Sequence, residues 1–216
     1  MDEGTKDGLG VALNEAALLG AEVIQDRRCA AITFAVLSLP LDGAPPPVDS
    51  RVSLVLVQVG RVVASLRNAR WDDDQAPAVP FALAELLKTV QSFGGQPVYG
   101  WKFIDTDDGY ERWANRLSLD ERFDGGSKQH SITLFQEGYE RHLDLRLWFG
   151  GLRIFRPDRT EIAIGEFVAA GKRWWDGLYS GDPRTRGSGI YPSNSPIPPV
   201  VGPAREGQAG AEIHEG

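Results

Sequence analysis

The sequence contains a single cysteine, Cys29. One cysteine cannot close an intramolecular disulfide, and it cannot by itself build a cysteine-rich metal centre. Long apolar runs are also missing, and the first residues, MDEGTKDG, lack the basic and apolar regions of a signal peptide. We therefore expect a cytoplasmic protein in a reducing compartment, with no membrane partner.

Signature motifs of nucleotide, catalytic and metal sites are missing as well. The glycine pairs 94–95, 125–126 and 150–151 form neither a G-x-G-x-x-G motif nor a P-loop. The aspartates at 72–74 and within 105–108 lack the spacing of a calcium-binding loop, and the sequence has no G-x-S-x-G elbow. We expect no cofactor and no bound metal.

Clustered positive charge is scarce. The formal net charge is −7 and the pI is about 5.0, whereas nucleic-acid binding depends on clustered Lys and Arg. The best basic run, RNAR at 67–70, is short and is soon followed by three aspartates. We expect nucleic-acid binding to be unfavourable. Hydrophobic residues make up 42% of the chain, which is enough for a sizeable core.

The composition divides the chain into three parts. Residues 1–8 are polar and are expected to be disordered. Residues 9–183 carry the periodic apolar patterns and are expected to form one domain. Residues 184–216 are rich in Pro, Gly, Ser and Glu, with too little apolar content to offset the entropy of ordering, so they are expected to form a disordered tail.

Apolar periodicity predicts the order of elements within the domain. A stripe from Leu13 to Ile24 indicates a first helix, and further helices are expected near 81–93, 110–117 and 167–178. The helix at 110–117 follows a capping box formed by Asp108 and Glu111. The predicted strands are 29–39, 51–59, 61–70, 98–104, 129–136, 141–149 and 152–155.

This order predicts an α+β fold with a largely antiparallel sheet. Two three-stranded meanders, turning at Gly60 and at Gly150, are joined by a linking strand, and the helices pack on one face. The segments Phe81–Pro97 and Phe167–Pro183 align with identical Phe, Ala, Gly and Pro positions. The domain is therefore either two pseudo-repeated halves, each a ββα unit, or a single unit in which helix-ending Gly and Pro simply recur.

Strand 141–149, RHLDLRLWF, carries the best candidates for chemistry. Its leucines point one way, and the polar or aromatic residues between them point the other. This second face holds His142, Asp144, Arg146 and Trp148. It can bind an anionic or aromatic ligand, with His142 as an acid or base oriented by Asp144. The alternative interpretation is a solvated sheet face whose charges pair across strands.

The adjacent residues Trp174 and Trp175 are candidate binding residues together with Trp148. Two neighbours on a helix cannot both point into one core. We expect at least one of them at a boundary, where it serves as an interface anchor or packs under the tail. The favoured function is a protein-interaction, assembly or adaptor module that binds a protein partner or forms a homo-oligomer. The alternative is an enzyme with a dispersed site at His142, Asp144 and Arg146.

Overall fold

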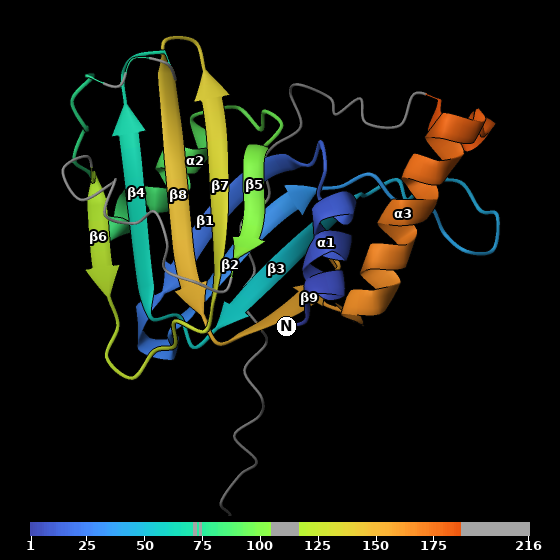
Figure 1. The fold of residues 1–216 in the computed structure, drawn as a ribbon, viewed down its shortest axis with the longest axis horizontal. Helices are drawn as coiled ribbons and strands as arrows, with labels where there is room; N and C mark the ends of the chain where they lie inside the picture. The colour runs from blue at the N-terminus through green and yellow to red at the C-terminus, as the bar shows by residue number, and fades with distance from the viewer. Residues whose placement is uncertain (71–72, 74, 105–116, 187–216) are drawn as a thin grey trace, which may run out of the picture.

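Runs of β-branched and other apolar residues form two five-stranded antiparallel sheets, A and C, in a computed structural model that describes residues 1–70, 73, 75–104 and 117–186 (Figure 1). Three α-helices accompany the sheets in these ranges. The predicted α+β class with antiparallel pairing is therefore confirmed. In the same ranges, no helix has the length and apolar character needed to cross a bilayer.

Sheet A has the strand order β1-β2-β3-β9-β10. Its strands are β1 (Ala17–Ile24), β2 (Cys29–Ala35), β3 (Arg51–Val57), β9 (Gly151–Phe155) and β10 (Glu161–Ile162). Sheet C has the order β5-β7-β8-β4-β6. Its strands are β4 (Arg61–Arg67), β5 (Tyr99–Ile104), β6 (Leu119–Arg122), β7 (His130–Gly138) and β8 (Arg141–Phe149).

The two predicted meanders do not form, because each third strand crosses to the other sheet. β3 continues into β4 at Gly60, but β4 pairs with β8; β8 continues into β9 at Gly150, but β9 pairs with β3. The crossings lie side by side: Gly60 N–H donates to Trp148 O, and Gly150 N–H donates to Val57 O. A Cβ atom at Gly60 would lie 2.4 Å from the Ser127 carbonyl oxygen, so only glycine fits this bend.

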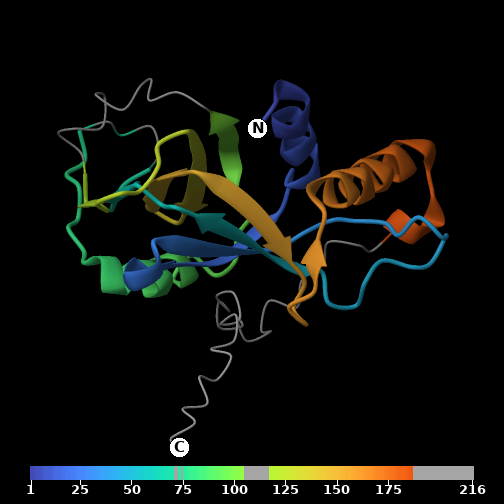
Figure 2. The ribbon, with the colours of Figure 1, turned by 90° about the horizontal axis from the view of Figure 1, so that it is seen from below.

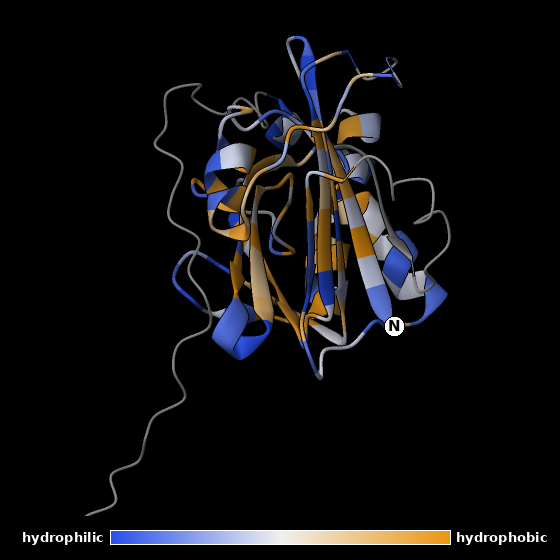
Figure 3. Ribbon diagram, turned by 90° about the vertical axis from the view of Figure 1, so that its left-hand side faces the viewer, coloured by the Kyte–Doolittle hydropathy of each residue, from blue (hydrophilic) through white to orange (hydrophobic). Residues whose placement is uncertain are grey.

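The hydrophobic core fills the space between the two sheets. Alternate residues of β2 and β3, such as Ile32 and Leu54, meet alternate residues of β7 and β8, such as Ile132 and Leu145, in one buried cluster. The strands are mostly hydrophobic in Figure 3, and hydrophilic residues concentrate in the connecting turns. One face of sheet C is therefore committed to the core, and its other face is left for different contacts.

The N-terminal region differs from both sequence predictions made for it. Residues 3–12, most of which were expected to be disordered, form α1 (Glu3–Ala12), because the Asp2 side chain caps the helix at Thr5 N–H and Leu9 is buried. The predicted helix from Leu13 to Ile24 is wrong, because residues 17–24 form β1. Full antiparallel pairing with β2 outweighs the helical periodicity there.

The helices do not form one layer. α1 contacts β5 and packs against α3 (Ile164–Ser180), whereas α2 (Leu86–Gln91) contacts β1. Figure 2 shows α1 and α3 on one side of sheet A and α2 on the opposite side. The predicted packing of all helices on one face is therefore not observed. Three short 3-10 turns complete the described elements: η1 (Gln25–Arg27), η2 (Leu83–Glu85) and η4 (Pro183–Thr185).

The two sheets have equivalent strand orders. In sheet A the run β1-β2-β3 is followed by β9, and in sheet C the run β5-β7-β8 is followed by β4, so each run is extended by the strand that continues from the other run. The helices are exchanged in the same way: α1 precedes β1 in the chain but contacts β5, and α2 precedes β5 but contacts β1. The sequence echo of Phe81–Pro97 with Phe167–Pro183 instead pairs α2 with α3, so it follows a different register. Duplication of a ββα unit stays a prediction.

Two sequence predictions fall partly or wholly outside the described residues. The capping box and the helix expected near 110–117 lie there, apart from residue 117. So does the predicted tail, except for residues 184–186. Thr185 is buried and its hydroxyl donates to Asp182 O, so the fold extends to η4, slightly past the predicted boundary at 183.

Candidate functional site

The polar side of β8 lies on the outer face of sheet C, away from sheet A. The leucines of β8 belong to the core, so the alternate residues point outward, as predicted. These outward residues are His142, Asp144, Arg146 and Trp148. His142 is 0% exposed and its neighbours on this face are buried or half-buried. The prediction that this face is solvated is therefore wrong.

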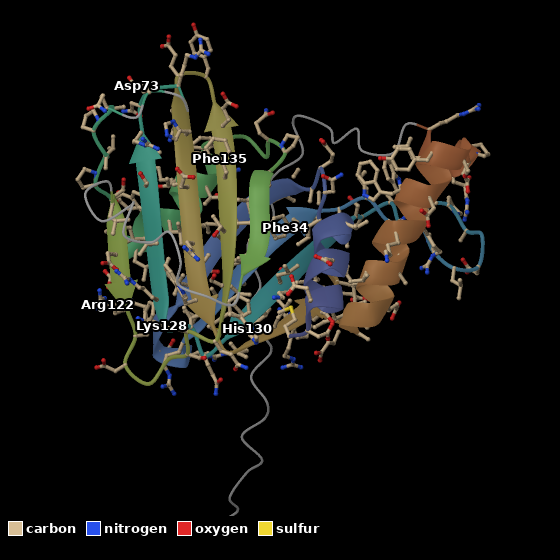
Figure 4. All side chains as sticks on the ribbon, viewed as in Figure 1. Phe34, Asp73, Arg122, Lys128, His130 and Phe135 are labelled. Carbon is tan, nitrogen blue, oxygen red and sulfur yellow. The ribbon has the colours of Figure 1, made fainter. Side chains whose placement is uncertain are left out.

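Strand β4 extends the outer face with residues that the sequence did not single out. Ser65 lies directly opposite Asp144, and Arg67 lies directly opposite His142. Opposed residues of antiparallel strands are close enough for their side chains to interact. On the other side of β8, Phe135 of β7 lies opposite Asp144. Figure 4 shows Phe135 in the upper half of sheet C.

Trp148 packs between two arginines. The guanidinium carbon of Arg146 lies 4.8 Å from the Trp148 ring centroid, and that of Arg61 lies 5.6 Å from it. Arg61 also donates two hydrogen bonds of 2.8 Å to the Asp120 carboxylate. Such cation–π contacts stabilise by about 2 kcal/mol when they are desolvated. These contacts give Trp148 and Arg146 a structural role in holding β4, β6 and β8 together.

The imidazole of His142 is oriented by the backbone. Its Nδ1 lies 2.9 Å from the Ala69 carbonyl oxygen. A carbonyl can only accept, so Nδ1 carries the hydrogen, and in the neutral ring Nε2 carries the lone pair. Nε2 is buried and has no hydrogen-bond partner among the described residues. The backbone carbonyl of Ala69 therefore orients the imidazole of His142, in place of the Asp144 carboxylate that was predicted to do so.

Asp144 and Arg67 form a loose ion pair. Their closest atoms, Oδ2 and Nη2, are 3.6 Å apart. Burial raises the pKa of Asp144 above its usual value, and the positive charge of the neighbouring Arg67 opposes that shift. Nε and Nη1 of Arg67 and Oγ of Ser65 are buried and make no hydrogen bond to any described residue. We call Ser65, Arg67, His142 and Asp144 the β4/β8 polar block.

The two predicted tryptophans of α3 have different surroundings. Trp174 is buried against Leu37 and Leu39, which follow β2. Leu39 is tied to α3 by its backbone, since its N–H donates to Ala170 O at 3.1 Å. The Trp174 and Trp175 rings meet edge to face, with centroids 4.8 Å apart. Trp174 therefore belongs to the interior and is a packing residue.

Trp175 lies at the boundary between interior and surface. Its indole Nε1–H donates to Val11 O of α1 at 3.1 Å, and its ring lies 6.2 Å from that of Tyr179. Tyr179 is 83% exposed and Leu178 is 40% exposed. Residues at i, i+3 and i+4 share one face of a helix. We call Trp175, Leu178 and Tyr179 the α3 aromatic surface.

These two places are separate parts of the fold. The β4/β8 polar block lies on sheet C, and the α3 aromatic surface lies on the helix at the other side of the molecule in Figure 1.

Comparison of the chain with protein-family models, curated proteins and solved structures finds no match. Function is therefore inferred from the chemistry of these two places.

Proposed function

We propose that the protein is an interaction or assembly module that binds a partner protein through the α3 aromatic surface. The observation that carries this proposal is the exposure of Tyr179 and Leu178 beside the half-buried Trp175. Large apolar side chains that gather on a surface mark contact sites, and Trp and Tyr are enriched among residues that dominate binding energy.

The surface is also prepared for binding before a partner arrives. The hydrogen bond from Trp175 to Val11 O and the edge-to-face contact with Trp174 hold the Trp175 ring in place. A ring that is already ordered loses little conformational entropy on binding. Exposed Lys172 and Asp176 flank it on the same helix, which supplies the polar rim usual for interfaces.

The size of the α3 aromatic surface favours a short apolar segment of the partner. Stable interfaces between globular faces use roughly 20–30 residues on each side, whereas this surface consists of three side chains from one end of α3. A peptide segment that inserts one or two apolar side chains beside Trp175 and Tyr179 matches it better.

The test is a double variant, Leu178→Ser with Tyr179→Ser. Both side chains are exposed, so the change in the free energy of unfolding should stay within about 0.5 kcal/mol per site. We expect the wild-type protein, immobilised, to retain a partner from a lysate of its own cells that the double variant loses. Light scattering of the purified protein shows whether a second copy occupies the surface instead.

Tyr139→Ser provides the matched control. Tyr139 is 91% exposed at the turn between β7 and β8, far along the chain from α3. This variant should retain the partner as the wild type does. Equal capture by the double variant would show that the α3 aromatic surface is not the interface.

A further inference from the structure

The β4/β8 polar block contains buried hydrogen-bonding atoms that make no hydrogen bond to any residue the structure describes. They are Oγ of Ser65, Nε and Nη1 of Arg67, and Nε2 of His142. A buried polar atom without a partner raises the free energy of the folded state by about 1–3 kcal/mol. Three such residues come together on two paired strands. Buried polar groups are almost always hydrogen-bonded, so this concentration calls for an explanation, and a bound ion or ligand is one.

The unpaired atoms have a defined polarity. The guanidinium of Arg67 is always charged and offers only N–H donors. Nε2 of neutral His142 offers only a lone pair, because Nδ1 donates to Ala69 O. The Asp144 carboxylate accepts as well, and the Ser65 hydroxyl can do either. A complementary ligand must therefore present acceptors toward Arg67 and a hydrogen toward His142 or Asp144.

Charge narrows the chemical class of ligand that the β4/β8 polar block can bind. The ion pair of Arg67 with Asp144, at 3.6 Å, is longer than a hydrogen bond and uses Nη2 alone. The remaining cationic N–H groups, at Nε and Nη1, favour an oxyanion, which can accept a charge-assisted hydrogen bond from either of them. A fully deprotonated oxyanion would be repelled by Asp144, so the oxyanion must keep a hydrogen of its own.

We propose that the β4/β8 polar block binds a phosphoryl oxyanion that keeps one P–OH hydrogen. Its unprotonated oxygens accept from Arg67 and Ser65, and its P–OH donates to His142 Nε2 or to Asp144. The side chain of Asp144 is 22% exposed, which gives the ligand a side of approach. Inorganic phosphate and a phosphate monoester share this chemistry.

The experiment compares three probes at a pH near 6, where a phosphate monoester keeps a P–OH hydrogen in about half of its molecules. Inorganic phosphate, phenyl phosphate and sulfate are titrated at equal ionic strength into the full chain. Binding is followed by calorimetry and by the imidazole ¹⁵N signals of the three histidines. We expect phosphate to bind saturably and to shift the Nε2 signal of His142. Sulfate has no hydrogen to donate at this pH and should bind at least about tenfold more weakly.

Two variants test whether Arg67 and Ser65 contribute to phosphate binding. Arg67→Met keeps the length of the side chain and removes the donors, so phosphate should bind about tenfold or more weakly. Ser65→Ala is a second and milder variant, with the same direction expected. Arg153→Met is the matched control, because Arg153 is exposed on β9 and pairs with Glu161. It should bind phosphate as the wild type does.

Each outcome of these experiments either assigns the ligand or overturns the proposal. Binding of inorganic phosphate alone assigns the site to the free ion, and binding of phenyl phosphate as well assigns it to monoesters. Absence of saturable phosphate binding, equal binding of sulfate, or unchanged binding in both Arg67→Met and Ser65→Ala would each overturn the proposal. None of these results depends on the partner proposed for the α3 aromatic surface.

Discussion

Cys29 and Asp144 are ionisable groups whose surroundings disfavour the charged form. Cys29 lies in β2 and is 4% exposed, and burial raises the pKa of its thiol. Burial raises the pKa of the Asp144 carboxyl in the same way on the outer face of sheet C. In both cases low local polarity, rather than a specific partner, is the largest cause.

The first prediction concerns Cys29. The thiolate is the reactive form, and both burial and the raised pKa reduce its population in the folded protein. Iodoacetamide at neutral pH should therefore label the folded chain at least about a hundredfold more slowly than the chain unfolded in urea. Intact-mass spectrometry measures both rates. Equal rates would contradict the burial of Cys29.

The second prediction concerns Asp144 and pH. Its folded-state pKa lies above the unfolded value, so the ionised carboxylate lowers the free energy of unfolding as pH rises through the folded pKa. Asp144→Asn removes this ionisation. The stability of the variant relative to the wild type should therefore increase as the pH rises above about 4, the ordinary pKa value for an aspartate. Urea unfolding at a series of pH values measures it, and a constant difference would disprove the interpretation.

The sequence revealed half of the β4/β8 polar block. Alternation along strand 141–149 correctly placed His142 and Asp144 on one face, because side-chain direction in a strand is a local property. Ser65 and Arg67 were missed because their proximity depends on the pairing of β4 with β8, which are far apart in the sequence. The burial of the face was missed for the same reason, since it is a property of the folded whole.

At the scale of elements, the end of β4 is fastened to the start of β6 by Ser118. Its buried hydroxyl accepts from Leu66 N–H at 2.8 Å and donates to Leu66 O at 3.2 Å. Leu66 O also accepts from Val79 N–H at 2.8 Å, so Ser118 matters most as the partner of Leu66 N–H.

We therefore expect Ser118→Ala to lower the free energy of unfolding by about 1–3 kcal/mol, because it leaves the buried Leu66 N–H without its partner, while Leu66 O keeps its hydrogen bond from Val79 N–H. Chemical denaturation measures the change. Ser92→Ala is the matched control, since Ser92 is exposed and its hydroxyl donates to Thr89 O at the end of α2. Its effect should stay within about 0.5 kcal/mol. A similar loss in both variants would contradict the role of Ser118.

Most elements were predictable, but their partners were not. The strands 51–59, 61–70 and 141–149 and the last helix were identified from local periodicity and from glycine at their ends. β1 was mistaken for a helix because its small residues fit both periods, and only pairing with β2 decides between them. A lone glycine between two strands was interpreted as a turn, although Gly60 and Gly150 also allow the close approach at a bend between sheets.

At the scale of the molecule, each sheet is assembled from both halves of the chain. Residues 1–70 supply β1, β2 and β3 to sheet A and β4 to sheet C, and the later residues supply the rest. Neither half holds a complete sheet. The exchange of α1 and α2 between the edges of the two sheets reinforces this dependence.

A chain divided after Gln75 should therefore behave as two interdependent fragments. Gln75 is exposed in the connection between β4 and α2. We expect fragments 1–75 and 76–216 to be unfolded separately and to regain strand content when they are mixed, as measured by circular dichroism. A division after Asp144, within β8, is the control and should not be rescued. Folding of either fragment alone would contradict the shared architecture.

The pairing of β3 with β9 has a consequence during synthesis. β1, β2 and β3 leave the ribosome early, but β9, which pairs with the edge of β3 opposite β2, ends only at Phe155. Until then β3 presents an open edge, which is the kind of strand that recruits other chains into aggregates. Contacts this distant in sequence also close slowly. The nascent chain therefore passes through a vulnerable interval that lasts until β9 arrives, and slow translation of residues 60–150 would lengthen it.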